Sequence, residues 1–184
     1  IRRCLVGSEM CIRDRESRVG WMPIEKFEYD NSRNRCYEIR ANWALYVDNY
    51  LEGFHIPFVH NDLNRTLDYD DYRTEIFDGG VLQIGIARDG EPSFEIPEES
   101  PDFGLEVAAY YYWIYPGLML NFYPWGLSVN LVLPLSVDRT RIEYYGFVWD
   151  KKFLGKGAGG DLDKVEEEDQ FVVESTHRLS LIHI

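Results

Sequence analysis

Two histidines and an acidic residue lie close together in the first third of this 184-residue chain. Glu52, His55 and His60 form the pattern E-x2-H-x4-H. Neutral imidazoles are ligands for iron, zinc and copper, and the third ligand decides the geometry of such a site. Two imidazoles and one carboxylate on one face of a metal ion leave its other face open. The pattern therefore predicts part of a metal site that a carboxylate from elsewhere in the chain completes.

Helical periodicity positions the first of these residues. Apolar residues recur at intervals of three and four along Trp43–His55, which predicts an amphipathic helix. Glu52 lies three residues before the end of that helix, so its side chain and that of the terminal histidine would share one face. We expect Pro57 to end the helix and let the chain turn, so that His60 approaches from the side.

The predicted last helix holds the densest supply of carboxylates. Residues 161–178 place apolar side chains along one flank of a polar helix, and the run Glu166 to Asp169 is wholly acidic. The glycine-rich segment 155–160 is flexible enough to lay this helix across the first one. Histidines five apart can also be packed or surface residues, and an acidic helix can be a solvated face. The scarcity of histidine, with four in the chain, favours the metal interpretation.

Both ends of the chain have the sequence of translated adapter DNA. Residues 4–15 (CLVGSEMCIRDR) and 179–184 (LSLIHI) are what the transposon-end adapters of a DNA library kit encode. We therefore expect residues 1–15 and 179–184 to be adapter-derived and residues 16–178 to form the domain. Without these ends, the 19 basic and 32 acidic residues become 15 and 30, a formal charge of −15.

This composition excludes several classes of function. The acidic balance argues against nucleic acid as a partner. Cys36 is the one cysteine outside the predicted adapter segments, so no disulfide framework or cysteine metal site is expected, and a reducing cytosol fits best. No apolar run approaches the length of a membrane span. We expect one soluble cytoplasmic domain with its own hydrophobic core and no membrane partner.

The remaining pattern predicts an α+β fold. Alternating segments indicate two hairpins, an acidic proline-containing surface loop and a four-stranded antiparallel meander. These are residues 24–30 and 35–40 joined by 31–34; 72–77 and 81–87 joined by 78–80; the loop 89–102; and strands 107–115, 118–123, 127–133 and 141–149. The order of hairpins, helix, sheet and helix predicts a curved antiparallel sheet with helices packed on one side.

A longer motif gives this site a family resemblance. Residues 42–60 read N-W-A-L-Y-V-D-N-Y-L-E-G-F-H-I-P-F-V-H and resemble the iron-binding segment of the α subunits of Rieske-type ring-hydroxylating oxygenases, N-W-K-x-x-x-E-N-Y-x-E-x-Y-H-x-P-x-x-H. Residues 168–178 resemble that family's E-D-x-x-x-x-E-x-x-Q-x-G-L segment, whose aspartate is the third iron ligand. Ala44 replaces a lysine and His177 a glutamine, and neither position is a ligand. The resemblance spans essentially residues 16–178.

The resemblance implies a role for each matching residue. His55, His60 and Asp169 would hold a mononuclear Fe(II) ion. Glu52 would link this ion to a Rieske cluster in a neighbouring subunit, and Asn49 would lie near the iron without binding it. The implied fold is a helix-grip (START-like) domain, in which an antiparallel sheet wraps around a long C-terminal helix.

The resemblance also implies cofactors and partners outside this sequence. The [2Fe-2S] Rieske cluster of the family is held by C-x-H and C-x2-H pairs, which this chain lacks. We expect the parent protein to carry that cluster domain upstream and to receive electrons from a reductase or a ferredoxin. The parent is expected to be a homotrimer or an α3β3 assembly.

The implied activity is oxygenation of a small organic substrate. Such a domain would activate O2 at Fe(II) and hydroxylate an aromatic ring or a quaternary amine such as choline, betaine or carnitine. The Gly-Phe-His-Ile-Pro context around His55 favours the quaternary amine branch. Several aromatic residues could line the pocket: Tyr110 to Trp113, Tyr115, Phe122, Tyr123 and Trp125. Because side chains alternate along a strand, about half of these would point away from the pocket, so the substrate-binding residues stay unassigned. The alternative is a non-catalytic helix-grip module that binds a hydrophobic ligand.

Overall fold

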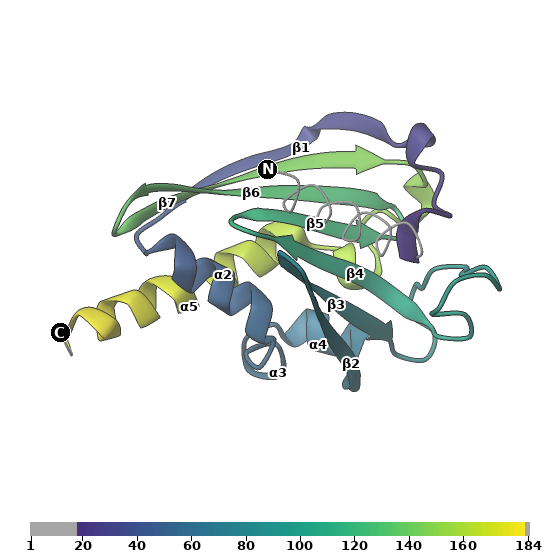
Figure 1. The fold of residues 1–184 in the computed structure, drawn as a ribbon, viewed down its shortest axis with the longest axis horizontal. Helices are drawn as coiled ribbons and strands as arrows, with labels where there is room; N and C mark the ends of the chain where they lie inside the picture. Colours follow the sequence, from purple (N-terminus) through teal and green to yellow (C-terminus); the bar gives the residue numbers. More distant parts are fainter. Residues whose placement is uncertain (1–17, 183–184) are drawn as a thin grey trace.

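A seven-stranded antiparallel sheet curves over the helices in the computed structural model, which describes residues 18–182 (Figure 1). Its strand order is β1-β7-β6-β5-β4-β3-β2. The strands are β1 (Glu28–Ile39), β2 (Leu67–Phe77), β3 (Gly80–Ala87), β4 (Val107–Ile114), β5 (Leu118–Tyr123), β6 (Gly126–Ser136) and β7 (Arg139–Val148). The helices are α2 (Trp43–Glu52), α3 (Ile56–Val59), α4 (Asn61–Thr66) and α5 (Leu162–Ile182), with 3-10 turns η1 (Ile24–Lys26), η2 (Lys151–Phe153) and η3 (Gly157–Gly159). The predicted α+β helix-grip class is confirmed.

Most of the predicted strands are present at the expected places. The four-stranded meander corresponds to β4–β7, and each of these strands pairs with the next one in the chain. The predicted hairpin around residues 78–80 is also present, as the connection between β2 and β3. Among the described residues, no helix combines the length and the apolar character that crossing a membrane requires.

The first predicted hairpin is wrong. Residues 28–39 form the single strand β1, which pairs with β7 along its length. Asp30 lies opposite Gly146 and Arg35 lies opposite Tyr144, so the polar residues between them form an irregularity rather than a turn. The side chain of Arg33 passes over Gly146, where a Cβ would lie 2.7 Å from the Cβ of Arg33. A bulge absorbs extra residues in one strand, and here it explains the turn-like composition.

The first helix also ends earlier than predicted. It stops at Glu52 because Gly53 adopts the left-handed conformation, with φ of 63°, that commonly ends helices. Pro57 does not break this helix but lies in the first turn of α3, where its missing N–H costs nothing. The sequence pattern gave no indication of α4, which follows directly at residues 61–66.

Helix α5 is anchored in a core on the helix-covered side of the sheet. Val173 of α5 is 1 % exposed and packs in one cluster with Ile142 of β7 and Met119 of β5. Tyr46 and Val47 of α2 belong to the same cluster, so α2 packs against both the sheet and α5, which it crosses in the view of Figure 1. This packing holds α5 beneath the sheet and fixes which of its side chains face inward.

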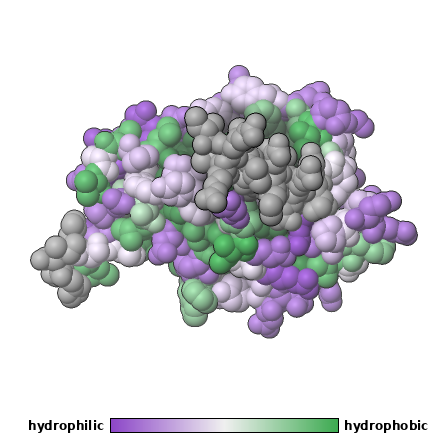
Figure 2. Space-filling model, in the orientation of Figure 1, coloured by the Kyte–Doolittle hydropathy of each residue, from purple (hydrophilic) through white to green (hydrophobic). Residues whose placement is uncertain are grey.

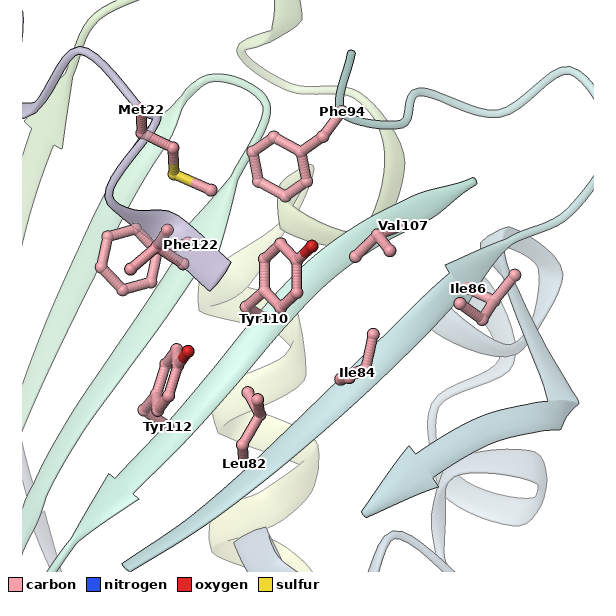
Figure 3. Close-up of a cluster of buried hydrophobic side chains, with 10 residues drawn as sticks. Met22, Leu82, Ile84, Ile86, Phe94, Val107, Tyr110, Tyr112 and Phe122 are labelled. Atoms are coloured by element: carbon pink, nitrogen blue, oxygen red, sulfur yellow. The ribbon is translucent and has the colours of Figure 1, made fainter. Parts of the chain in front are cut away.

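The opposite face of the sheet carries a second core. Side chains of β3, β4 and β5 project to this face while α5 passes behind the strands (Figure 3). Tyr110 and Tyr112 are buried there under Met22 and Phe94. On the space-filling view, the described part of the surface mixes hydrophilic and hydrophobic residues (Figure 2). Each face of the sheet is thus covered, and alternate residues of β4 serve different layers.

We expect removal of both predicted adapter segments to leave the stability nearly unchanged. Residues 1–15 lie outside the described part of the chain. At the other end, Leu179 is 60 % exposed and Ser180 hydrogen-bonds the backbone of His177 one turn earlier. Because adapter codons were never selected to fit this core, a protein lacking 1–15 and 179–184 should have a melting temperature within about 2 °C of the original, measured by differential scanning calorimetry.

The control is a further truncation that ends at Thr176. It also removes His177, which is 7 % exposed, and should lower the melting temperature clearly. A fall of many degrees after the shorter truncation would mean that these ends belong to the fold.

Candidate metal centre and adjoining cavity

Three elements deliver the two histidines and the aspartate to one point. His55 follows the Gly53 cap and precedes α3, and His60 lies between α3 and α4. Asp169 comes from the middle of α5. Their nearest donor atoms lie within 4.8 Å of one another, with 3.0 Å between the two histidine Nε2 atoms. Oδ1 of Asp169 is 3.0 Å from Nε2 of His60 and 3.3 Å from Nε2 of His55.

These separations fit three ligands around one ion. Donor atoms about 2.1 Å from a metal and about 90° apart are separated by about 3.0 Å. Two imidazole nitrogens and one carboxylate oxygen are also the donor set of the facial arrangement that leaves open positions on non-heme iron. The geometry of His55, His60 and Asp169 therefore suits a divalent transition metal in chemistry and in size.

The second nitrogen of each imidazole is held by a carboxylate. Nδ1 of His55 lies 2.5 Å from Oε1 of Glu52, and Nδ1 of His60 lies 2.8 Å from Oε2 of Glu168. When Nδ1 donates its proton to a carboxylate, Nε2 of a neutral imidazole carries a lone pair. Two such lone pairs then face each other at 3.0 Å, an arrangement that needs positive charge between them. A metal ion bound between them would supply that charge.

The electrostatics of the metal-free site favour cations. Burial lowers the pKa of His55, but Asp169 and then Glu52 outweigh it, so this pKa lies above its ordinary value. The same balance, with Asp169 and Glu168, raises the pKa of His60. Burial raises the pKa of Asp169, yet hydrogen bonds from both imidazoles outweigh it and the pKa is lowered. Protons and metal ions would therefore compete for one strongly cation-attracting position.

The structure brings all the predicted site residues together. Besides the three donors, Glu52 contacts His55, and Asn49 Nδ2 donates to Oδ1 of Asp169 at 2.7 Å. The role of Glu168 was not predicted, although it precedes Asp169 in the acidic run. Its signal was present in principle, because metal-binding histidines usually donate their other N–H to a carboxylate.

A cavity of about 100 Å³ opens beside these donors, under the centre of the sheet. Its volume corresponds to about seven to ten water molecules, which is room for a small organic molecule. Tyrosine is the most frequent residue in its wall. The lining includes Tyr46, Tyr50, Tyr72, Tyr111, Tyr123, Tyr144, Asn49, Gln83, Asn121, Ser128, Asn130, Glu166 and the three metal-site residues.

Only some of the aromatic residues singled out in the sequence reach this cavity. Tyr111 and Tyr123 line it, whereas Tyr110 and Tyr112 belong to the core on the other face. Tyr115 is 66 % exposed. Successive side chains of β4 point to opposite faces of the sheet, so its tyrosines divide between the cavity and the other core. The sequence could not tell whether the odd-numbered or the even-numbered residues face the cavity.

Glu166 is a buried carboxylate in the cavity wall. It is 2 % exposed, and its Oε2 accepts hydrogen bonds from the hydroxyls of Tyr46, at 2.7 Å, and Tyr144. Its Oε1 is buried without a hydrogen-bond partner among the described residues. Burial raises the pKa of Glu166 to about 8, despite the opposite effect of the two tyrosine hydrogen bonds. The sequence gave no sign of this burial, because the residue lies within a run of acids.

We expect Glu166→Gln to stabilise the metal-free protein at high pH. A pKa that is higher in the folded than in the unfolded state gives stability that is present below about pH 4.5 and is lost as pH rises through about 8. Glutamine has no charge to bury, so at pH 9 the variant should unfold with a free energy larger by a few kcal/mol, since one pKa unit is about 1.4 kcal/mol. Urea unfolding with a chelator present, at pH 5 and pH 9, measures the difference.

The matched control is Glu167→Gln, which removes the same charge from an exposed neighbour on α5. Its stability should follow that of the original protein at both pH values. Parallel pH profiles for the Glu166 variant and the original protein would contradict the prediction.

Comparisons with known proteins agree with this geometry. The family model described as ring hydroxylating alpha subunit (catalytic domain) matches residues 20–180. Choline monooxygenase of Arabidopsis thaliana is 34 % identical over 153 residues, which cover 78 % of this chain and 34 % of that protein. The carnitine monooxygenase oxygenase subunit of Escherichia coli is 31 % identical over 115 residues, which cover 62 % of this chain and 29 % of that protein. The chain thus spans about a third of the length of these relatives.

Solved structures share the fold. A quaternary ammonium Rieske monooxygenase, studied for carnitine oxidation by gut microbiota and inter-subunit electron transfer, superposes with a TM-score of 0.65 at 23 % identity, over 90 % of this chain and 43 % of that one. Naphthalene 1,2-dioxygenase from Rhodococcus sp. gives 0.59 at 18 % identity, over 79 % and 43 %. Together with the family match over most of its length, these findings establish that the chain belongs to the catalytic domain family of the ring-hydroxylating oxygenase α subunits.

Proposed function

We propose that this chain is the iron-binding part of a Rieske-type oxygenase that uses O2 to hydroxylate a small quaternary amine. The observation that carries the proposal is the convergence of two imidazole Nε2 atoms and one carboxylate oxygen within hydrogen-bond distance of one another. Each imidazole is held by a carboxylate at its other nitrogen. Such an arrangement costs stability without a cation and suits an open-faced metal site.

In this proposal His55, His60 and Asp169 hold one Fe(II) ion. The ion, when bound, supplies open coordination positions for the activation of dioxygen. Glu52 and Glu168 fix the tautomer and the orientation of the two imidazoles. The amide of Asn49 donates to the same aspartate oxygen that faces the imidazoles and so restrains its rotation.

Electrons would reach the iron through Glu52. Its Oε1 contacts Nδ1 of His55, its Oε2 accepts a hydrogen bond from the backbone N–H of Phe54, and its side chain, at the end of α2, is 28 % exposed. A carboxylate in this position can accept a hydrogen bond from an imidazole of a second metal centre. We propose that this centre is a [2Fe-2S] Rieske cluster of a neighbouring subunit, in a homotrimer or α3β3 assembly of a longer parent protein with an upstream cluster domain. A reductase or a ferredoxin would reduce the cluster.

The cavity supports a quaternary amine as substrate. Six tyrosines line it, and aromatic faces attract cationic methylammonium groups. The relatives named for choline and carnitine have the highest similarity to this chain among the proteins described above. A neutral aromatic ring would leave Oε1 of Glu166 without a partner, whereas a cation would favour the ionised form of this carboxyl. The alternative of a binding module for a hydrophobic ligand is disfavoured for the same reason.

Iron binding is the first test of this proposal. Anaerobic titration of the chain with Fe(II), followed by desalting and metal analysis, should give one iron per chain. We expect His55→Ala and His60→Ala each to reduce the bound iron at least tenfold, because each removes one of three ligands. Circular dichroism should show that both variants remain folded.

Two variants outside the site serve as controls. Asp163→Asn lies on the same helix as Asp169 and contacts Arg35, and His177→Asn lies two turns beyond the metal site. Both should keep stoichiometric iron. Full iron content in both ligand variants would refute the assignment of the site.

Electron delivery through Glu52 is the second test, in the full-length protein with both metal centres. Glu52→Gln should keep iron and substrate binding but lose at least about 90 % of turnover, because an amide cannot accept hydrogen bonds from two imidazoles as a carboxylate does. Single-turnover reduction of the iron by a pre-reduced cluster measures the step directly.

The exposed Glu167 again provides a control, since Glu167→Gln changes the net charge equally and should keep full turnover. A normal rate of iron reduction in the Glu52 variant would remove this residue from the electron path. Loss of iron from the variant would instead indicate a structural role toward His55.

A further inference from the structure

The cavity has a polar group that the metal site does not use. Glu166 lies three residues before Asp169 on α5, so both carboxylates project from one face of the helix. Asp169 faces the histidines, whereas Glu166 contacts the two tyrosine hydroxyls in the cavity wall. The carboxylate of Glu166 is therefore a separate feature, and it needs its own explanation.

Two tyrosines hold one oxygen of this carboxylate and leave the other free. The hydroxyls of Tyr46 and Tyr144 both donate to Oε2, and they lie 2.8 Å from each other. Oε1 is buried and has no hydrogen-bond partner among the described residues. An unsatisfied buried carboxylate oxygen costs more than a neutral polar atom would. The cavity thus contains a carboxyl group that burial keeps largely protonated at neutral pH, and a cationic ligand beside Oε1 would favour its ionised form.

The charges of the cavity wall indicate the sign of that ligand. Its lining residues among the described part of the chain include no lysine and no arginine, while Glu166 and Asp169 are acidic. Both imidazoles are neutral when they bind a metal through Nε2. Asp169 faces the proposed metal ion, so Glu166 is the acidic group left to compensate a cationic ligand, whereas a carboxylate of the ligand would find no lysine or arginine in this wall.

The tyrosines indicate the shape of the ligand. Tyr50 stands edge-on to Tyr111, with ring centroids 6.5 Å apart, and Tyr111 stands edge-on to Tyr123 at 5.9 Å. The hydroxyl of Tyr50 is bonded to Oδ1 of Asn121 at 2.7 Å, so its polar end is already occupied. Rings arranged in this way offer faces and edges to methyl groups and attract a charged ammonium by the cation-π interaction.

We propose that Glu166, oriented by Tyr46 and Tyr144, is the counter-charge for the ammonium group of the substrate, and that the substrate is a small cation without a carboxylate, of the choline type. This inference rests on the proposed function, since it names the substrate class of that site. Glu166 is a binding residue that touches the ligand, and the two tyrosines are positioning residues. A zwitterion of the carnitine type is discriminated against because its carboxylate would be buried unpaired.

Isothermal titration of the metal-loaded chain under anaerobic conditions tests the proposal with three probes. The probes are choline, its neutral carbon analogue 3,3-dimethylbutan-1-ol, and carnitine. Choline should bind at least tenfold more tightly than either of the other two. Glu166→Gln should lower the affinity for choline at least tenfold and change that for the neutral analogue less than threefold. Tyr144→Phe should reduce the preference for choline over the neutral analogue, which a purely structural role would not do.

Glu167→Gln is the matched control and should bind choline like the original chain. Equal affinities for choline and its neutral analogue, no binding of choline, or unchanged choline binding by the Glu166 variant would each overturn the proposal. Carnitine binding as tight as choline binding would overturn the exclusion of a carboxylate. If that binding were lost in Arg33→Ala, it would place the carboxylate in the neighbouring groove that Arg33 lines.

Iron content, measured on the same samples, separates this proposal from the proposed function. Glu166→Gln should keep one iron per chain, because Glu166 is not a ligand. Selective choline binding by a chain that holds no iron would support the cation site and contradict the oxygenase. Stoichiometric iron without choline selectivity would support the oxygenase and contradict the cation site.

Discussion

The packing of α5 beneath the sheet is the constraint on which the whole site depends. Glu166, Asp169 and Val173 are spaced at i, i+3 and i+7, so they lie along one helical face. Val173 is 1 % exposed and fixes that face against the core formed by β5, β7 and α2. The same rotation of the helix turns both carboxylates inward. Burial of one valine thereby determines where the anionic groups of the site lie, more than a hundred residues after His60.

This arrangement places two carboxylates in the interior, and they are compensated unequally. Asp169 receives a hydrogen bond from Asn49 and faces two imidazoles, and although burial raises its pKa, the hydrogen bonds from the imidazoles outweigh that effect and lower it. Glu166 receives tyrosine hydroxyls on one oxygen only, and its pKa is raised to about 8 by burial. An apolar side chain at position 166 would avoid this cost. Residues that reduce stability in this way are characteristic of binding and catalytic sites.

The sequence predicted which residues converge at the candidate metal centre better than it predicted their surroundings. The long motif that contains His55 and His60 and the acidic run at Asp169 have specific spacing, and the structure brings these residues together. Residues 31–34 form a bulge in β1 and not the predicted turn, because polar residues of this kind occur in both bulges and turns. The burial of Glu166 was not predictable, since its neighbour Glu167 has the same side chain and is exposed. Which of two adjacent acids faces inward depends on the rotation of α5, and tertiary packing sets that rotation.

The spacing of Glu166 and Asp169 along α5 relates the proposed binding of a cation to the position of the candidate metal site. Side chains at i and i+3 of a helix start about 5–6 Å apart. Because Glu166 and Asp169 line the same cavity, a cation held at Glu166 would lie in the space that also adjoins the two histidines. A small amino alcohol spans such a distance with its own two-carbon chain, whereas a longer substrate would have to fold back or extend past the donors. Under the proposed function, the rotation of the helix would set both the charge that the cavity accepts and the distance of that charge from the metal site.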